Sequence, residues 1–242
     1  MTTPNSARTR EATILAVGLV VGLALLGWYV GSSLIRFKSF ERTVTVKGLA
    51  EREVPADVAI WPVMFTAASN DLGEVYADLG SDAAKLTSFL GEHGFTDEEI
   101  TVAPPSVTDK LAQQWGGGGD VGLRYTATQT ITVYTTRVDV VRAAKSGLAE
   151  LGKQGLVIAG NEYQTKTEYI FTGLNELKPA MIEEATRNAR EVAEKFAADS
   201  QSRLGKIRQA QQGIFSISDR DANTPHIKKV RVVSTVEYYL AD

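Results

Sequence analysis

Cysteine is absent from all 242 residues of the sequence. Disulfides, thiolate metal sites and thiol nucleophiles are therefore excluded together. Only two histidines are present, and motifs such as H-E-x-x-H, G-x-S-x-G and the phosphate-binding P-loop are missing. We expect His93, at a Gly-Glu-His-Gly helix end, and His226, in a polar loop, to be surface residues. The sequence thus predicts no catalytic residue, no metal site and no cofactor.

A basic stripe is also missing. Beyond residue 38 the chain carries 22 basic and 28 acidic residues, a net charge of −6. A domain this acidic is a poor electrostatic match for nucleic acid, so we expect no nucleic-acid partner. Four acids, Glu41, Glu51, Glu53 and Asp57, are interleaved with basic residues. We interpret them as a salt-bridged surface, with acid–base chemistry by paired carboxylates as the alternative.

Charge is absent from one long run, residues 12–35. As a helix it would extend roughly 36 Å, enough to cross a hydrocarbon core of about 30 Å. A cleaved signal peptide is the alternative, but its apolar region is usually only about 7–15 residues long. We therefore predict a cytoplasmic tail at 1–11, a transmembrane helix at 12–35 and a soluble domain at 36–242.

Residues suited to a membrane interface flank this helix, since basic side chains and aromatic rings favour the headgroup region. Basic residues lie on both sides, so their count does not decide the orientation. The short tail with two arginines is easily retained inside, which places the large domain outside. The candidate membrane-interface residues are Arg8, Arg10, Trp28, Tyr29, Arg36 and Lys38. Gly18 and Gly22 form a GxxxG match, which favours lateral association of helices.

The remainder alternates between strand and helix patterns. Helices are predicted from about Asp71, as N-cap, to Leu90, and over residues 138–151 and 179–204. A strand–helix–strand segment occurs twice, and both its helices end in G-x-x-G, which indicates an internal duplication. We therefore predict an α+β fold of antiparallel or mixed sheets packed by helices. Strands are expected over residues 41–50, 56–68, 100–107, 123–135, 156–169, 210–218 and 228–239, the first two as antiparallel neighbours.

A glycine run interrupts this pattern after Trp115. A phosphate loop needs specific glycine spacing and a helix N-terminus directly after it, whereas Asp120 and a strand follow here. We interpret the run as a flexible hairpin or interface loop. Trp115 is predicted to contact a neighbouring subunit or the pore of a ring, with a simply exposed aromatic as the alternative. The candidate oligomer-interface loop is Trp115, Gly116, Gly117, Gly118 and Gly119.

Several short motifs occur in a characteristic order: T-V-T-V-K-G-L-A at 43–50, V-P-A-D-V-A at 54–59, Y-T-A-T-Q-T-I-T-V at 125–133 and L-G-K-I at 204–207, the last after a helix with alanine at every fourth position. This order resembles the SIMPL-domain family over nearly all of residues 40–240. That family includes bacterial periplasmic immunogenic proteins and a mammalian signalling adaptor. The resemblance implies an α+β domain with a duplicated core, a bacterial envelope location, ring or cage-like homo-oligomers, and a link to envelope or oxidative stress.

Together these patterns predict a non-enzymatic envelope protein that crosses the bacterial inner (cytoplasmic) membrane once. Its soluble domain would face the periplasm or cell exterior and self-assemble into a large homo-oligomer on the membrane. One alternative is an adaptor that presents its acidic surface to a different protein. Another is an enzyme with an atypical carboxylate site, which a concave pocket holding two acids with perturbed pKa values would distinguish.

Overall fold

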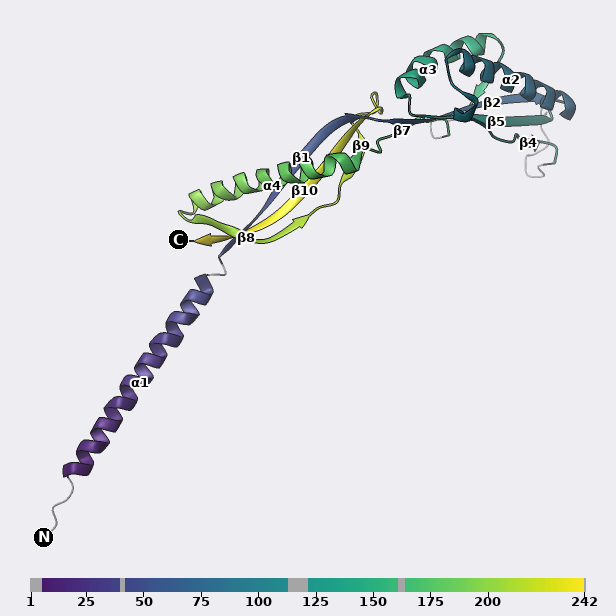
Figure 1. Cartoon of the computed structure of the whole chain (residues 1–242). Helices are drawn as coiled ribbons and strands as arrows, with labels where there is room; N and C mark the ends of the chain where they lie inside the picture. The colour runs from purple at the N-terminus through teal and green to yellow at the C-terminus, as the bar shows by residue number, and fades with distance from the viewer. Residues whose placement is uncertain (1–5, 40–41, 113–121, 161–163, 242) are drawn as a thin grey trace. The chain divides into compact units, whose positions relative to one another are not determined.

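The computed structural model describes residues 6–39, 42–112, 122–160 and 164–241 (Figure 1). The chain divides into two compact units. Unit 1 comprises Met1–Ala50, Ala180–Phe215 and Arg231–Asp242, and unit 2 comprises Glu51–Pro179 and Ser216–Val230. Each unit is described by itself below.

Helix α1 (Ser6–Ser39) contains the long apolar run. Its segment Thr13–Ser33 has a mean hydropathy of 2.2 over its 21 residues, and none of it is buried. By length and composition this segment is able to cross a membrane, and a signal sequence meets the same criteria. The predicted apolar helix is therefore confirmed.

Unit 2 contains a sheet with the order β3-β5-β2-β6, in which every neighbouring pair is antiparallel. Helix α2 connects β2 to β3, and helix α3 connects β5 to β6, so the strand after each helix pairs with the long strand of the other repeat. This is the split β-α-β arrangement of ferredoxin-like folds. Both the α+β class and the repeated strand–helix–strand pattern are confirmed. The elements are β2 (Val58–Ser69), α2 (Leu72–Glu92), β3 (Ile100–Val102), β4 (Ser106–Asp109, beside β5), β5 (Tyr125–Thr135), α3 (Val138–Lys153), β6 (Ile158–Ala159) and β7 (Glu168–Ile170, beside β2).

Both helices of unit 2 pack on the same side of this sheet (Figure 1). Strand β2 supplies alternate side chains to the core because successive residues of a strand point to opposite faces. The helices contribute apolar residues at intervals of three or four. The main buried residues are Ala59, Trp61, Val63 and Phe65 of β2, Val75, Leu79, Leu86 and Leu90 of α2, and Val141 and Ala144 of α3.

The helix ends of unit 2 follow their predicted signals. Asp71 is the N-cap of α2 and accepts hydrogen bonds from the backbone N–H groups of Gly73 at 2.6 Å and Glu74 at 3.1 Å. The second glycine of each G-x-x-G adopts a left-handed conformation, with φ of 85° at Gly94 and 90° at Gly155. Each therefore closes its helix without steric cost.

Unit 1 is built from three separate chain segments. Strands β1 (Thr43–Pro55), β10 (Ile227–Ala241) and β8 (Arg203–Gln212) lie in the order β1-β10-β8. Strand β9 (Ser216–Asp219), which belongs to unit 2, also pairs with β10. Helix α4 (Leu174–Asp199) runs along this sheet (Figure 1). It contributes a buried stripe, all at most 3% exposed, that consists of Met181 followed by four small side chains: Ala185, Ala189, Ala193 and Ala197. This stripe lets the helix approach the strands closely.

Two expectations about the chain path are wrong. β1 pairs with β10 while β2 lies in the other sheet, so the first two strands are not antiparallel neighbours. The junction between them is fixed differently: Ala56 N–H donates to the carbonyl of His226 at 2.8 Å, and Asp57 accepts from the N–H of Thr172 at 2.9 Å. In addition, α4 runs from Leu174 to Asp199 rather than over residues 179–204, so Pro179 lies inside the helix, where its missing N–H removes one backbone hydrogen bond to the carbonyl of Asn175.

Candidate functional site: a cationic pocket in unit 2

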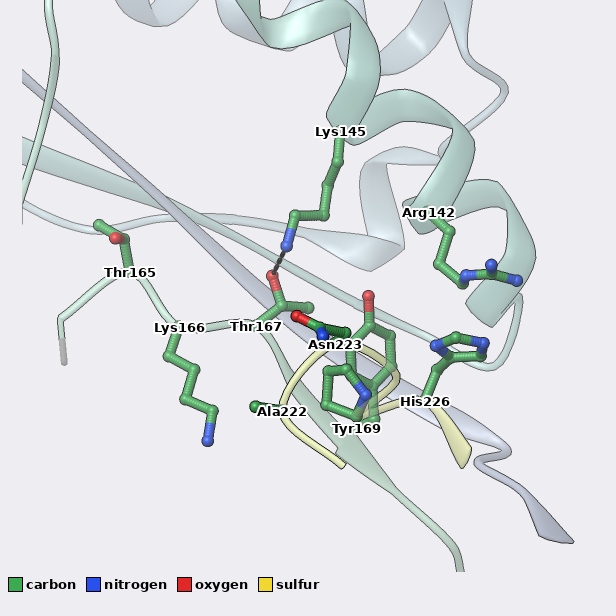
Figure 2. A pocket seen from close by; sticks show the side chains of 10 residues that line it. Arg142, Lys145, Thr165, Lys166, Thr167, Tyr169, Ala222, Asn223 and His226 are labelled. Carbon is green, nitrogen blue, oxygen red and sulfur yellow. Dashed lines mark hydrogen bonds between the residues drawn. The ribbon is translucent and has the colours of Figure 1, made fainter. Parts of the chain in front are cut away.

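Unit 2 is acidic, with 20 acidic and 13 basic residues in its sequence ranges. It nevertheless contains a pocket whose lining is positively charged. The pocket has a volume of about 590 Å³, and its lining includes three cationic side chains and no carboxylate (Figure 2). The lining residues are Arg142, Lys145, Thr165, Lys166, Thr167, Tyr169, Ala222, Asn223, Pro225 and His226. Positive charge is thus concentrated locally in a unit of net charge −7.

One wall of the pocket comes from helix α3. Arg142 and Lys145 are three residues apart, so they lie on the same face of the helix. The neighbouring residues Val141 and Ala144 are fully buried against the sheet, which fixes the rotation of the helix. Both cations are therefore held at the pocket by the amphipathic pattern of α3.

A second wall comes from β7 and the segment before it. Tyr169 is paired with Ala59 of β2, which places its ring on the helix-covered side of the sheet. Thr167 is only 5% exposed and accepts a hydrogen bond from the ammonium of Lys145 at 2.8 Å, drawn as a dashed line in Figure 2. This bond joins α3 to the segment leading into β7.

The third wall is the turn before β10. Asp221 accepts hydrogen bonds from the N–H groups of Asn223 and Thr224, both at 2.8 Å, and also from the Thr224 hydroxyl. These bonds and that from Arg220 lower the pKa of Asp221 to about 2. The carboxylate is therefore charged at neutral pH and holds the turn that positions Asn223 and His226.

The charges around the pocket are unevenly compensated. Arg142 pairs with Asp139 at 3.1 Å, but Asp139 is 92% exposed, so this pair contributes little. Lys166 is 3.9 Å from Asp219, which also pairs with the buried Lys228. Within the described part of the chain, no carboxylate pairs with Lys145. Burial lowers the pKa of Lys145, as expected for a cation with only a neutral partner.

Tyr169 and His226 form the aromatic part of the pocket. Their rings meet edge to face, with 6.1 Å between centroids. Burial, and then the positive charge of Arg142, lower the pKa of His226. Burial also raises the pKa of Tyr169. At neutral pH both rings are therefore uncharged, and the positive charge of the pocket comes from its arginine and lysines.

A second hollow of unit 2, about 550 Å³, includes two acids of α2 in its lining, Asp78 and Asp82. A hollow that holds two acids meets part of what the carboxylate-enzyme alternative requires. Asp82 is 8% exposed and accepts a hydrogen bond from Lys85 at 2.9 Å, so its charge is already compensated. Among the residues that the structure describes, no group of three histidines or acids is placed to hold a metal ion.

The SIMPL family model, described as a protein of unknown function (DUF541), matches residues 44–237. The chain belongs to the SIMPL family. The resemblance inferred from the strand and helix motifs is thereby confirmed. The sequence matches no curated protein.

The candidate membrane-interface residues of this SIMPL protein all belong to α1. Trp28 and Tyr29 are 77% and 72% exposed, so both rings are available to a lipid surface. Their role at the membrane, and that of Arg8, Arg10, Arg36 and Lys38, stays a prediction. The candidate interface loop, Trp115 and Gly116 to Gly119, lies outside the described residues, so its role also stays a prediction.

Of the two histidines of the SIMPL protein, His93 is the C-cap residue of α2, as expected, and its Nδ1 is 2.8 Å from the carbonyl of Phe89. His226 is partly exposed and lines the pocket. Sequence reasoning missed this pocket because its walls come from three distant segments with no common spacing. The only local signal is the pair of cations, Arg142 and Lys145, on one face of α3.

Proposed function

We propose that this SIMPL protein is a non-enzymatic, single-pass protein of the bacterial cytoplasmic membrane that self-assembles on its outer side. One observation carries the proposal: the described part of the protein buries none of the apolar segment Thr13–Ser33. An apolar helix of this length is stable in lipid, where its backbone groups are satisfied internally. A Cβ at Gly18 or Gly22 would meet nothing within 4 Å, so this small-residue face is available to a second helix.

The edge of the unit 1 sheet also supports self-assembly. Among the described strands, β8 is the last of the order β1-β10-β8, and its side chains are mostly exposed. Ile207 on this strand is 49% exposed, and Ile214 just after it is 93% exposed. An exposed edge strand with apolar side chains favours pairing with another chain. We propose that copies of the protein meet along β8 to form a ring or cage.

Light scattering of the full chain in detergent, over a dilution series, tests the assembly. We expect a mass of several protomers for the natural protein and a smaller mass for Ile214→Asp. The matched control is Leu72→Asp, which changes a residue 41% exposed at the start of α2 in unit 2 and leaves the mass unchanged. A strict monomer at every concentration contradicts the proposal.

Protease protection in membrane vesicles tests the orientation. We expect the large C-terminal part to be cleaved in right-side-out vesicles or spheroplasts without disruption of the membrane. Cleavage only from the cytoplasmic side contradicts the proposed orientation. Crosslinking in cells tests the adaptor alternative, which a stoichiometric heterologous partner would favour.

The proposal includes the role in envelope or oxidative stress that the family resemblance implies. A strain lacking the protein is expected to be more sensitive to oxidants or envelope-damaging detergents, and the full chain should restore resistance. Complementation by a variant with an alanine at each polar residue of the unit 2 hollow around Asp78 and Asp82 would support the non-enzymatic reading. Loss of rescue by that variant, with the fold intact, would favour the enzyme.

A further inference from the structure

We propose that the cationic pocket of unit 2 binds a small organic phosphate through Arg142, Lys145 and the hydroxyl groups of Thr167 and Tyr169. This inference is separate from membrane assembly, because every residue involved lies within unit 2. It assigns a ligand class to a site built from helix α3, the segment leading into β7 and the turn before β10.

The donors of the pocket are suited to an anion with several oxygens. Lys145 donates to the Thr167 hydroxyl, which leaves the hydroxyl hydrogen of Thr167 available for a ligand. No hydrogen bond to the Tyr169 hydroxyl is found within the described residues, although the residue is only 8% exposed. In Figure 2 this hydroxyl points toward α3, the helix that carries Arg142 and Lys145. Two cations and two hydroxyl groups therefore border one space.

Electrostatics favour an anion in this space. Arg142 and Lys145 are close on one helix face, and their repulsion is not offset by a carboxylate in the lining. The exposed pair between Arg142 and Asp139 is weak enough for the guanidinium to turn toward a ligand. A bound anion would relieve the repulsion and give Lys145 a negatively charged partner beside the neutral Thr167 hydroxyl. The acidic remainder of unit 2 would meanwhile exclude anions from its other surfaces.

Size and donor number select the ligand class. A volume of about 590 Å³ is more than a phosphate group alone needs and lies within the usual range for small-molecule sites, about 300–1,000 Å³. The remaining space borders the rings of Tyr169 and His226, which suit the organic part of a ligand. A phosphate monoester presents three acceptor oxygens and a charge of about −1.5 to −2 at neutral pH, which matches the donors better than a single carboxylate does.

Titration of the full chain in detergent with inorganic phosphate and with pyrophosphate tests the inference. Binding is followed by calorimetry at constant ionic strength, and acetate serves as the carboxylate arm. We expect saturable binding of both phosphate probes, with acetate at least about tenfold weaker. Lys145→Met should weaken phosphate binding at least about tenfold. The matched control is Lys153→Met, on the same helix but outside the pocket and 73% exposed, which should leave binding unchanged.

A second readout separates a binding role from a structural one. The melting temperature of Lys145→Met without phosphate should stay close to that of the natural protein, because removal of a repelled charge offsets loss of the hydrogen bond to Thr167. If this variant does not fold, Arg142→Gln replaces it in the same titration. In the natural protein, NMR of 13C-methylated lysines should show that phosphate raises the pKa of Lys145.

Three results would overturn the inference. They are absence of saturable phosphate binding by the natural protein, equal affinity for acetate, and equal weakening by Lys153→Met and Lys145→Met. The last result would mean that the anion is attracted by α3 as a whole rather than held in the pocket. Any of these results would leave the membrane-assembly proposal standing, because phosphate binding and membrane assembly are argued from different parts of the chain and tested by different measurements.

Discussion

At Gly48 the backbone of β1 touches the backbone of α4. A Cβ added there would lie 1.8 Å from the carbonyl oxygen of Ala185 and 2.4 Å from the nitrogen of Ala189. Neither atom belongs to a movable side chain, so any larger residue must push the helix away from the strand. The glycine of the T-V-T-V-K-G-L-A motif is therefore a packing requirement of unit 1.

Gly48→Ala is expected to destabilise the protein by about 3 kcal/mol, the upper part of the usual range for overpacking. Gly80→Ala in helix α2 is the control, because a Cβ there meets nothing within 4 Å. It should stabilise the protein by about 0.5–1 kcal/mol, since alanine favours a helix more than glycine does. Urea unfolding of both variants measures the difference, and equal stability of the two would contradict the close contact.

Glu99 is the clearest source of pH-dependent stability in unit 2. Its carboxylate accepts hydrogen bonds from the Thr135 hydroxyl at 2.5 Å and from Thr96 N–H at 2.9 Å, and it pairs with Arg137. Burial alone would raise the pKa of Glu99, but these hydrogen bonds and the charge of Arg137 outweigh it and lower the pKa from 4.5 to about 2. The stabilisation is therefore complete above pH 4.5 and is lost as the pH falls toward 2.

Glu99→Gln should reduce the free energy of unfolding at neutral pH by about 1–2 kcal/mol, the usual size for hydrogen bonds to a charged group that is partly exposed. The difference from the natural protein should shrink as the pH falls through the window from 4.5 to about 2. Denaturant unfolding at a series of pH values measures it. If the difference in unfolding free energy stayed constant down to about pH 2, the charge of the Glu99 carboxylate would not be its cause.

Among the elements, the ends of helices α2 and α3 show what a short sequence signal can specify. In α2 only the second glycine of G-x-x-G, Gly94, has a positive φ, whereas Gly91 lies in the helix with nothing within 4 Å of an added Cβ. The two glycines of one motif therefore have opposite requirements, although they look equivalent in the sequence.

Gly94→Ala should destabilise the protein by about 1–2 kcal/mol, because an alanine is strained in the left-handed conformation. Gly91→Ala should instead stabilise it by up to about 1 kcal/mol. Thermal unfolding of the two variants, followed by circular dichroism, gives the comparison directly. A loss of similar size in both would mean that the motif acts through something other than helix termination.

Elements with local signals were predictable, and those that depend on distant pairing were not. Asp71 marks the start of α2 and Gly94 its end, because caps act within a few residues. The separation of β1 from β2 into two sheets leaves no local trace, since both strands show ordinary alternation and their partners lie far along the chain. The pocket was missed for the same reason: Lys145, Thr167 and His226 meet only once the sheet of unit 2 has formed.

At the scale of the whole molecule, α1 is the apolar helix that we propose anchors the chain in a membrane. Leu23 lies near the middle of Thr13–Ser33 and is 62% exposed. A charge there would be far from either interface of a bilayer. Ser33 lies at the end of the same segment, where a charged side chain reaches the headgroups.

Leu23→Arg should release the protein from the membrane fraction, because an arginine at the centre of a membrane helix costs about 2.5–3.5 kcal/mol. Ser33→Arg, the same side chain at the end of the helix, should leave the protein in that fraction. Alkaline extraction of membranes followed by immunoblotting distinguishes the two. Retention of Leu23→Arg at the natural level would contradict a membrane-spanning α1.

The three-segment construction of unit 1 also imposes an order of events in time. The sheet of unit 2 uses β2 to β7, and all these strands are synthesised before α4 is complete. Gly48 can pack against Ala185 only after a further 137 residues (185 − 48) have been synthesised. At about 5–20 residues per second, that interval lasts roughly 7 to 27 s during synthesis. β1 thus emerges early and stays without its partner strand β10 until residues 227–241 have been synthesised.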